Sequence, residues 1–344
     1  MKYYLRFTTR HNIPSEPETH HIIAWDTTVI DHTIYIAYTF HSCVEKTFKN
    51  RIILFDTESS ISAKLQCDLS ILGDEEIYNI ASHNDKLYII TWNFMGYTLY
   101  TIELKSMIVT KILDIGGDLR QGIQVLDGVM YLISGNGRSF DLSLMKINLT
   151  SMNVENISLE KSTKDFVYLF SKNNILYLYE NFGEGKREIF MINQDNQLHS
   201  LNMEDTKDAL KGAKIGMNDI MITRSSNGNH VLETFDLNEH RWISAPIEKC
   251  NSDYPIYVVP LYKPKIGNKI YTLFISQTAS STKWDIRILE LKPTLVDFCL
   301  LQIVDELLLE MDDKKMEIVL GKLPINLRPK LINMMGWRKA NNIE

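Results

Sequence analysis

The sequence has few cysteines, and their spacing does not indicate a disulfide framework or a zinc site. Cys43, Cys67, Cys250 and Cys299 are widely separated, and no Cys-x-x-Cys pair occurs among them. Small disulfide-rich domains and cysteine zinc sites depend on closely spaced cysteines, so neither is indicated here. We expect four reduced thiols, most of them buried.

The chain also lacks long apolar runs and an excess of basic residues. No segment approaches the roughly 18 uncharged apolar residues of a bilayer-spanning helix, and residues 1–10 contain no apolar run of signal-peptide length. The 37 basic and 43 acidic residues give a formal net charge of −6, which provides no general attraction to nucleic acids or anionic membranes. We therefore expect an intracellular protein, cytoplasmic or nuclear, that binds neither nucleic acid nor membrane.

Recognisable catalytic and cofactor-binding motifs are lacking as well. Residues 183–186 (Gly-Glu-Gly-Lys) have the wrong spacing for a phosphate-binding loop, and no Ser or Thr follows the lysine. His20 and His21 have no third metal ligand in a recognisable pattern, and no Ser/His/Asp signature is apparent. We expect a protein that is not an enzyme and that uses no cofactor or metal.

What the chain does contain is a repeated pattern: a polar turn, an apolar strand usually built around Ile-Tyr or Leu-Tyr, a polar loop and a second strand. The six copies are centred on positions 35, 88, 131, 177, 221 and 271. Repeats of this length built from strands are typical of β-propellers. Helical periodicity is hard to find before residue 293, which argues against an α-solenoid. We predict an all-β, six-bladed β-propeller over residues 1–292, followed by a small α-helical tail over residues 293–344.

Turn chemistry and strand count support this prediction. The turns at residues 83–85, 126–128 and 172–174 are rich in Asn, Asp and Gly, which tolerate the positive φ angles of tight hairpins. The sixth copy offers only three strands and ends at Leu291. Residues 2–8 have the apolar character of a strand and are predicted to supply the missing outer strand, which would close the ring.

The repeats resemble those of kelch-type propellers in a degenerate form. The Tyr-bearing strand is present in most copies, but the Gly-Gly pair typical of kelch repeats is approached only at residues 134–137 (Ser-Gly-Asn-Gly). Trp242 is the best match to the downstream kelch tryptophan. The resemblance covers about residues 1–292 and implies a propeller fold.

The tail begins after Pro293, which suits the start of a helix. Its leucines lie on several sides of the predicted helix, so it presents more apolar surface than contact with the propeller alone would cover. Leu295 and Cys299, four residues apart, are neighbours on the helix surface. The segment resembles the BC box through which substrate receptors of cullin ubiquitin ligases bind elongin C. The resemblance assigns elongin binding to Thr294, Leu295, Phe298, Cys299 and Ile303.

A second motif follows about twenty residues later. It resembles a cullin-2 box and consists of Leu323, Pro324, Leu327 and Leu331. A cullin-5 box would usually carry a second proline where this chain has Asn326, so cullin-2 is favoured. With both boxes in this order after a repeat domain, the chain resembles kelch-domain substrate receptors of elongin–cullin ligases. The resemblance implies elongin C, elongin B and cullin-2 as partners, with ubiquitin transfer performed by partner chains.

The substrate, a protein or a degron peptide such as a C-terminal end, is expected at the loops that join the second to the third strand of each repeat. Propellers bind ligands at the mouth of the central channel with loops of this kind. Arginine can bind a carboxylate through paired hydrogen bonds. The predicted substrate-binding residues are Trp92, Arg138, Ser139, Arg224 and Ser225. An alternative that the residues leave open is a scaffold or cytoskeletal propeller whose tail is a structural cap.

Overall fold

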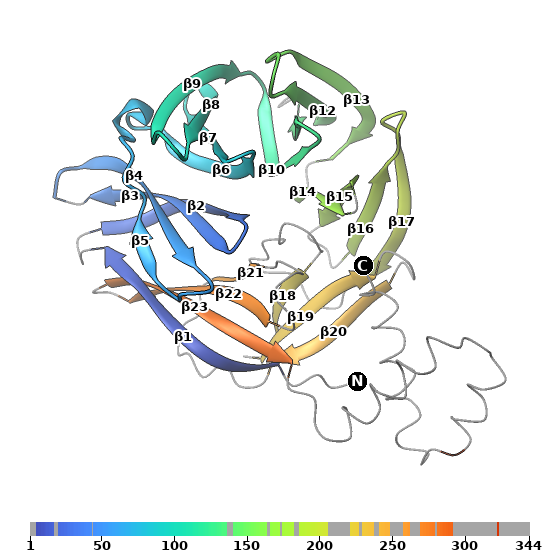
Figure 1. Ribbon diagram of the computed structural model, residues 1–344. Helices are drawn as coiled ribbons and strands as arrows, with labels where there is room; N and C mark the ends of the chain where they lie inside the picture. The colour runs from blue at the N-terminus through green and yellow to red at the C-terminus, as the bar shows by residue number, and fades with distance from the viewer. Residues whose placement is uncertain are drawn as a thin grey trace.

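The computed structural model shows an all-β propeller, with sheets arranged around a common centre (Figure 1). It describes residues 5–16, 20–42, 44–135, 140–163, 166–172, 174–181, 186–205, 221–226, 229–236, 241–247, 257–261, 269–278, 281–291 and 322, and side chains, with gaps, between residues 22 and 201 and at Lys322. No helix within these residues has the length and apolar character needed to cross a membrane.

Two of the sheets have four strands each. The first consists of β2 (His20–Ile30), β3 (Thr33–Ser42), β4 (Thr47–Asp56) and β5 (Ser62–Lys64). The short 3-10 helix η1 (Ser70–Leu72) leads to the second, which consists of β6 (Glu76–His83), β7 (Lys86–Asn93), β8 (Gly96–Glu103) and β9 (Ile108–Ile115).

The other two sheets are larger. The eight-stranded sheet consists of β10 (Asp118–Leu126), β11 (Val129–Gly135), β12 (Asp141–Asn148), β13 (Val154–Ser162), β14 (Phe166–Lys172), β15 (Ile175–Asn181), β16 (Lys186–Ile192) and β17 (Leu198–Asp205). The seven-stranded sheet consists of β18 (Met221–Ser226), β19 (Asn229–Asp236), β20 (Arg241–Ile247), β1 (Leu5–Glu16), β23 (Ser281–Leu291), β22 (Lys269–Thr278) and β21 (Tyr257–Leu261).

The described strands thus form four sheets, which corrects the predicted count of six blades. Each large sheet joins two groups of antiparallel strands through a single parallel strand pair. β10 pairs with β14 through Gln121 and Tyr168, and β1 pairs with β20 through Leu5 and Ile247. A repeat in the sequence predicts which segments form strands. It does not predict whether strands of neighbouring repeats also pair with each other.

The N-terminal strand pairs with the last strand of the propeller. β1 runs antiparallel to β23, from Leu5 opposite Leu291 to Glu16 opposite Thr282. The two strands lie side by side in Figure 1, β1 in blue and β23 in orange. This is the pairing that the strand count predicts, and it extends beyond residues 2–8. The start and the end of the repeat region are therefore joined in one sheet.

The tight turns have the backbone conformation that their sequences predict. Asn84 and Asp85, between β6 and β7, have φ angles of 48° and 58°. Asp127 and Gly128, between β10 and β11, have φ angles of 48° and 74°. Two consecutive positive φ angles are the mark of the type I′ turn, whose twist matches that of the strands it joins.

The strands are apolar because neighbouring sheets bury both of their faces. On β7, Ile89 packs into the core shared with the first sheet, whereas Ile90 packs into the core shared with β10–β12. Both side chains are fully buried. Consecutive residues of a strand point to opposite faces, so a strand between two sheets needs an unbroken apolar run. Leu132 and Ile133 divide the same way on β11.

Side-chain hydrogen bonds connect the first strands of neighbouring repeats. The carboxylate of Asp26 on β2 accepts a hydrogen bond from the amide Nδ2 of Asn79 on β6, at 3.0 Å. The hydroxyl of Ser171 on β14 donates to Oε1 of Gln124 on β10, at 2.7 Å. Asn79, Gln124 and Ser171 are buried, so these bonds satisfy groups that cannot reach water. The inner strands are thereby held in fixed positions relative to each other.

Candidate functional site

The turn between β7 and β8 exposes two large apolar side chains. Phe94 is 97% exposed and Met95 is 95% exposed. The ring of Trp92, which is half-buried, lies next to Phe94 with 5.6 Å between the ring centroids. We call Trp92, Phe94 and Met95 the β7–β8 tip. Single exposed apolar residues are common, but an adjacent pair beside a tryptophan is typical of a contact surface.

The conformation of this tip is fixed by Asn93. Its Oδ1 accepts a hydrogen bond from the backbone N–H of Met95 at 2.8 Å, an Asx turn. Its Nδ2 donates to Oε1 of Glu75 at 2.9 Å. The turn ends at Gly96, whose φ of 139° favours glycine. The exposed side chains therefore project from a backbone whose conformation is held by the hydrogen bonds of Asn93.

Glu75 is the centre of the network beneath the tip. Its Oε2 accepts hydrogen bonds from the hydroxyl of Thr91 and from the phenol of Tyr100, the latter at 3.3 Å. Burial, together with the negative charge of Glu75, raises the pKa of Tyr100 to about 12. The phenol stays protonated at neutral pH and remains a donor to the carboxylate. Asn93 is thus anchored on a carboxylate that is itself held by two buried hydroxyls.

The same segment is tied to the neighbouring sheet. Nδ2 of Asn50 on β4 donates to the backbone carbonyl of Glu75 at 2.8 Å, and the hydroxyl of Thr39 donates to Oδ1 of Asn50 at 2.6 Å. Val44, in the corresponding turn between β3 and β4, is 73% exposed. Two neighbouring second-to-third-strand turns therefore present apolar side chains.

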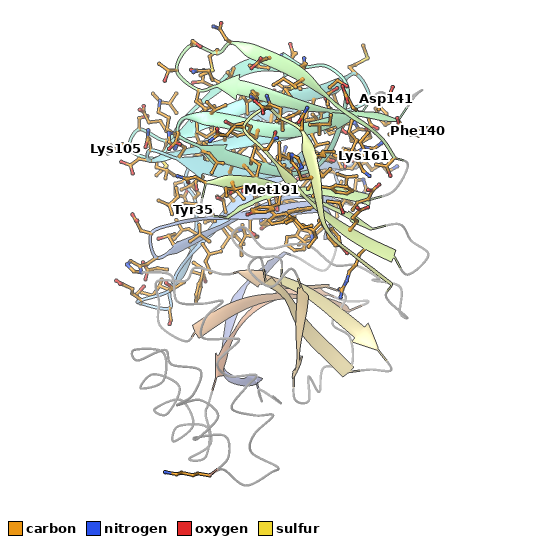
Figure 2. All side chains as sticks on the ribbon, turned by 90° about the vertical axis from the view of Figure 1, so that its right-hand side faces the viewer. Tyr35, Lys105, Phe140, Asp141, Lys161 and Met191 are labelled. Carbon is orange, nitrogen blue, oxygen red and sulfur yellow. The ribbon has the colours of Figure 1, made fainter. Side chains whose placement is uncertain are left out.

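The connections divide between two faces of the ring. Strand direction alternates within each repeat, so second-to-third-strand connections lie on one face and third-to-fourth-strand connections lie on the other. Figure 2, a view from the side, shows this division: Phe140 and Asp141, from the connection between β11 and β12, lie opposite Lys105, from the turn between β8 and β9. The β7–β8 tip belongs to the face with Phe140.

The residues predicted to bind substrate lie in different parts of the fold or outside the described residues. Trp92 is the next-to-last residue of β7 and belongs to the tip. Arg224 and Ser225 were expected in a loop, but they lie within β18, where their backbones pair with Val231 and His230 of β19. The reason is that β18 continues to Ser226, so its hairpin begins later than the sequence suggests. The side chains of these two residues, and all of Arg138 and Ser139, lie outside the described part of the chain.

The residues assigned to the two tail motifs all belong to the part of the chain that follows β23. The predicted elongin-binding residues Thr294, Leu295, Phe298, Cys299 and Ile303 lie outside the described residues. The same holds for the predicted cullin-binding residues Leu323, Pro324, Leu327 and Leu331.

Sequence reasoning missed the support of the tip. Glu75 and Tyr100 lie 18 residues before Asn93 and seven after it, so no local pattern connects them. Met95 was missed as well, although its exposure follows from its place in a four-residue turn between two apolar strands. The polar Asn93 and the glycine Gly96, which separate the apolar runs of β7 and β8, are the signal that marks this turn.

Within the described residues, no group of three or more His, Cys, Asp or Glu side chains could hold a metal ion. Cys67 is a free thiol and is half-buried. Burial raises its pKa to about 11, so the thiol is protonated at neutral pH and lacks the thiolate character of an activated nucleophile.

No protein-family model and no curated protein matches this chain. Among solved structures, a structural genomics protein of unknown function from Bacteroides thetaiotaomicron is similar, with a TM-score of 0.51 and 11% identity over 84% of this chain and 75% of that one. TolB from Acinetobacter baumannii gives a TM-score of 0.45 and 8% identity over 78% and 80% of the two chains. The β-propeller domain of the Trilobed protease from Pyrococcus furiosus gives a TM-score of 0.46 and 9% identity over 80% of this chain and 97% of that one. At these identities such likeness concerns the fold and not the function.

Proposed function

We propose that this protein is a non-catalytic recognition propeller that binds a protein partner with the face bearing the β7–β8 tip. The observation that carries this proposal is the near-complete exposure of Phe94 and Met95 on a turn fixed by Asn93. Aromatic and methionine side chains contribute much of the buried area in protein interfaces.

The rigidity of the tip supports the same conclusion. Binding costs free energy when a loop must be ordered, and this cost falls when the loop already has its bound conformation. The network from Asn93 through Glu75 to Tyr100 holds the turn before any partner arrives. An exposed apolar tip with this support is suited to insertion into a pocket of a partner.

In its specific form, the proposal is a substrate-recognition subunit of a cullin-2 RING ubiquitin ligase, in which partner subunits carry out ubiquitin transfer. Its support is the sequence of the tail: the BC-box pattern around Leu295 and Cys299 for elongin C with elongin B, and the cullin-2-box pattern around Pro324. The substrate is a protein or degron peptide, and no cofactor is needed.

The topology agrees with a division of labour between two faces. β23 begins at its connection with β22, on the face of the β7–β8 tip, and ends at Leu291 on the opposite face. β23, the last strand before the tail in the sequence, therefore ends on the face away from the tip. As part of the same proposal, the six kelch-like repeats are β2–β5, β6–β9, β10–β13, β14–β17, β18–β20, and β21–β23 completed by β1.

Affinity purification of the full chain with purified elongins B and C and cullin-2 tests the specific form. A stable complex that is lost on substitution of Leu295 and Cys299 is the expected result. A wild-type chain that binds no elongin would eliminate the ligase assignment and leave the scaffold or cytoskeletal alternative, in which the tail is a structural cap.

A further inference from the structure

The outer edge of the first sheet is only partly covered. β5 has three residues and pairs only with Ile53–Phe55 of β4. One further backbone hydrogen bond, from the N–H of Leu65 to the carbonyl of Ile52 at 2.9 Å, ends this contact. Within the described part of the chain, Thr47–Arg51 of β4 pair with β3 on one side and with no strand on the other.

The hydrogen bond from Leu65 to Ile52 shows which backbone N–H and C=O groups of β4 point to the outer edge. In an antiparallel ladder, the N–H and C=O of one residue point to the same side, and the side alternates along the strand. Because the carbonyl of Ile52 points to the outer edge, the backbone groups of Phe48 and Asn50 point there too. The side chain of Asn50 is engaged elsewhere, with Thr39 and the carbonyl of Glu75. It does not cap this edge.

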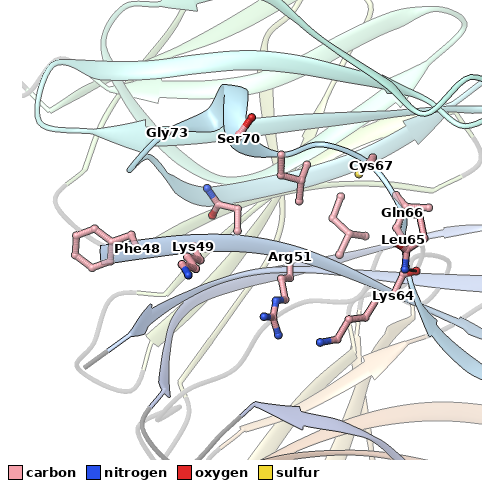
Figure 3. Close-up of a pocket in the computed structure, with 12 residues that line it drawn as sticks. Phe48, Lys49, Arg51, Lys64, Leu65, Gln66, Cys67, Ser70 and Gly73 are labelled. Carbon is pink, nitrogen blue, oxygen red and sulfur yellow. Dashed lines mark hydrogen bonds between the residues drawn. The ribbon is translucent and has the colours of Figure 1, made fainter. Parts of the chain in front are cut away.

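A groove lies along this edge. After Lys64 the chain separates from β4 and passes through η1, leaving a cavity of about 340 Å³ between the two segments. Figure 3 shows Phe48 and Gly73 at one end of the groove and Leu65 and Cys67 at the other. Leu65, Cys67 and Leu69 are half-buried in its lining and provide apolar surface. The shape is that of a slot alongside a strand.

The charge of the lining has one sign. Lys49, Arg51 and Lys64 line the groove, and no Asp or Glu does. Lys49 also forms an ion pair with Glu45, which lies outside the lining, and the guanidinium of Arg51 lies 4.6 Å from the ring centroid of Phe40. Figure 3 shows the side chains of Arg51 and Lys64 on the same side of β4. In a chain with a net charge of −6, this is a local concentration of positive charge.

We propose that this edge binds an acidic, extended peptide segment of a partner protein as an additional strand beside β4. The peptide backbone bonds to the outward groups of Phe48 and Asn50, and its alternate acidic side chains lie near Lys49, Arg51 and Lys64. Addition of a strand to an exposed sheet edge is an established mode of peptide recognition, in which backbone bonds give affinity and alternate side chains give specificity. This surface is separate from the β7–β8 tip.

The charges also decide between the possible occupants. Lysines on a sheet edge oppose pairing with a second copy of the same edge, because like charges would face each other. They attract an acidic strand for the same reason. A second copy is therefore disfavoured, and an acidic segment is favoured.

Fluorescence anisotropy of the full chain with the labelled peptide Glu-Val-Glu-Val-Glu-Val-Glu tests the proposal. We expect binding that weakens at high salt and falls at least about tenfold in the K49E/K64E variant. The matched control, K105E/K111E, reverses two exposed lysines away from the groove and should bind like the wild type. A peptide with N-methyl groups on alternate amides that face β4 should lose binding, because it cannot donate to the edge.

Cys67 offers an independent local readout. Since it lines the groove, the bound acidic peptide should slow its alkylation, measured by mass spectrometry of the fragment that contains it. Absence of peptide binding, equal binding by K49E/K64E, or indifference to N-methylation would each overturn the proposal. A concentration-dependent dimer that K49E/K64E abolishes would overturn it in favour of a second copy. None of these measurements depends on the tip or on elongin binding, so the failure of the proposed function would be seen separately.

Discussion

Gly122 of β10 lies directly against the backbone of Leu169 of β14. A Cβ atom at Gly122 would be 2.7 Å from the backbone nitrogen of Leu169 and closer still to its carbonyl oxygen. The φ of Gly122 is +92°, a conformation that favours glycine. This contact is adjacent to the parallel pair of Gln121 and Tyr168 that joins the two halves of the eight-stranded sheet. The join therefore depends on the absence of a side chain at one position.

Substitution Gly122→Ala should lower the free energy of unfolding by about 3 kcal/mol or more, because β10 and β14 must separate to admit the methyl group. Gly128→Ala is the matched control: its φ is also positive, at 74°, but a Cβ there would meet only His83 at an ordinary 3.8 Å. This control should cost about 1 kcal/mol from backbone strain alone. Urea denaturation followed by circular dichroism measures both. Equal losses of unfolding free energy in the two variants would show that the close approach of β10 and β14 at Gly122 adds no cost to the substitution.

The β7–β8 tip should be needed for partner binding and not for folding. Phe94→Ser with Met95→Ser removes apolar side chains that are almost fully exposed, so the melting temperature should change little. Proteins that co-purify with the wild-type chain through the tip should be reduced at least about tenfold, as expected for the loss of interface anchors. Quantitative mass spectrometry of affinity-purified chains provides the comparison.

The control for this experiment is Ile108→Ser. Ile108 is 59% exposed and follows the turn between β8 and β9, on the face opposite the tip. It should retain all partners. If the tip variant and the Ile108 variant bind the same proteins in the same amounts as the wild type, the assignment of the tip is wrong.

Substitutions in the two motifs of the tail should affect the binding of two different partners. Leu295→Ala with Cys299→Phe should abolish binding of elongin C, because it empties one contact and blocks the close approach that a small side chain permits. Pro324→Ala should weaken cullin-2 binding and leave elongin C bound. Size-exclusion chromatography of reconstituted mixtures distinguishes these complexes. Loss of elongin in the Pro324 variant would contradict a two-motif tail.

The parts of the fold that local chemistry determines were predictable from the sequence. Asn84-Asp85 and Asp127-Gly128 predict tight turns because few residues other than Asn, Asp and Gly tolerate positive φ angles at two consecutive positions. The structure has type I′ geometry at both turns. Apolar runs such as that around Ile89 predict strands, and the structure buries both faces of this one. The pairing of β1 with β23 follows from counting the strands that remain unpaired.

The parts that depend on distant contacts were not predictable. The single parallel pair between Gln121 and Tyr168 decides that two repeats share one sheet, and it requires residues more than 40 positions apart to approach closely. The length of β18 decides that Arg224 lies in a strand and not in a loop. The support of the tip by Glu75 also requires the fold to be formed first. Local pattern therefore identifies the strands, and tertiary contacts decide how the sheets join.

The reactivity of Cys67 should depend on pH in a way that reports its burial. Alkylation requires the thiolate, and burial, with a smaller contribution from the charge of Asp68, raises the pKa of this thiol to about 11. The rate of reaction with iodoacetamide should therefore rise about tenfold per pH unit from pH 7 to pH 10 without levelling off. In urea, where the chain is unfolded, the rate should level off above about pH 8.5, the ordinary value for cysteine.

The same shift has a consequence for stability, with a definite sign. The folded state holds the proton of Cys67 more tightly than the unfolded state does, so this contribution to stability is fully present below the unfolded pKa. It is lost as the pH rises toward the folded value of about 11. Cys67→Ala should remove this part of the alkaline loss of stability, measured as the urea midpoint at pH 7 and pH 10. A plateau near pH 8.5 in the alkylation rate of the folded wild-type protein would mean that Cys67 is open to water, and the groove beside β4 would then be wider than its lining residues indicate.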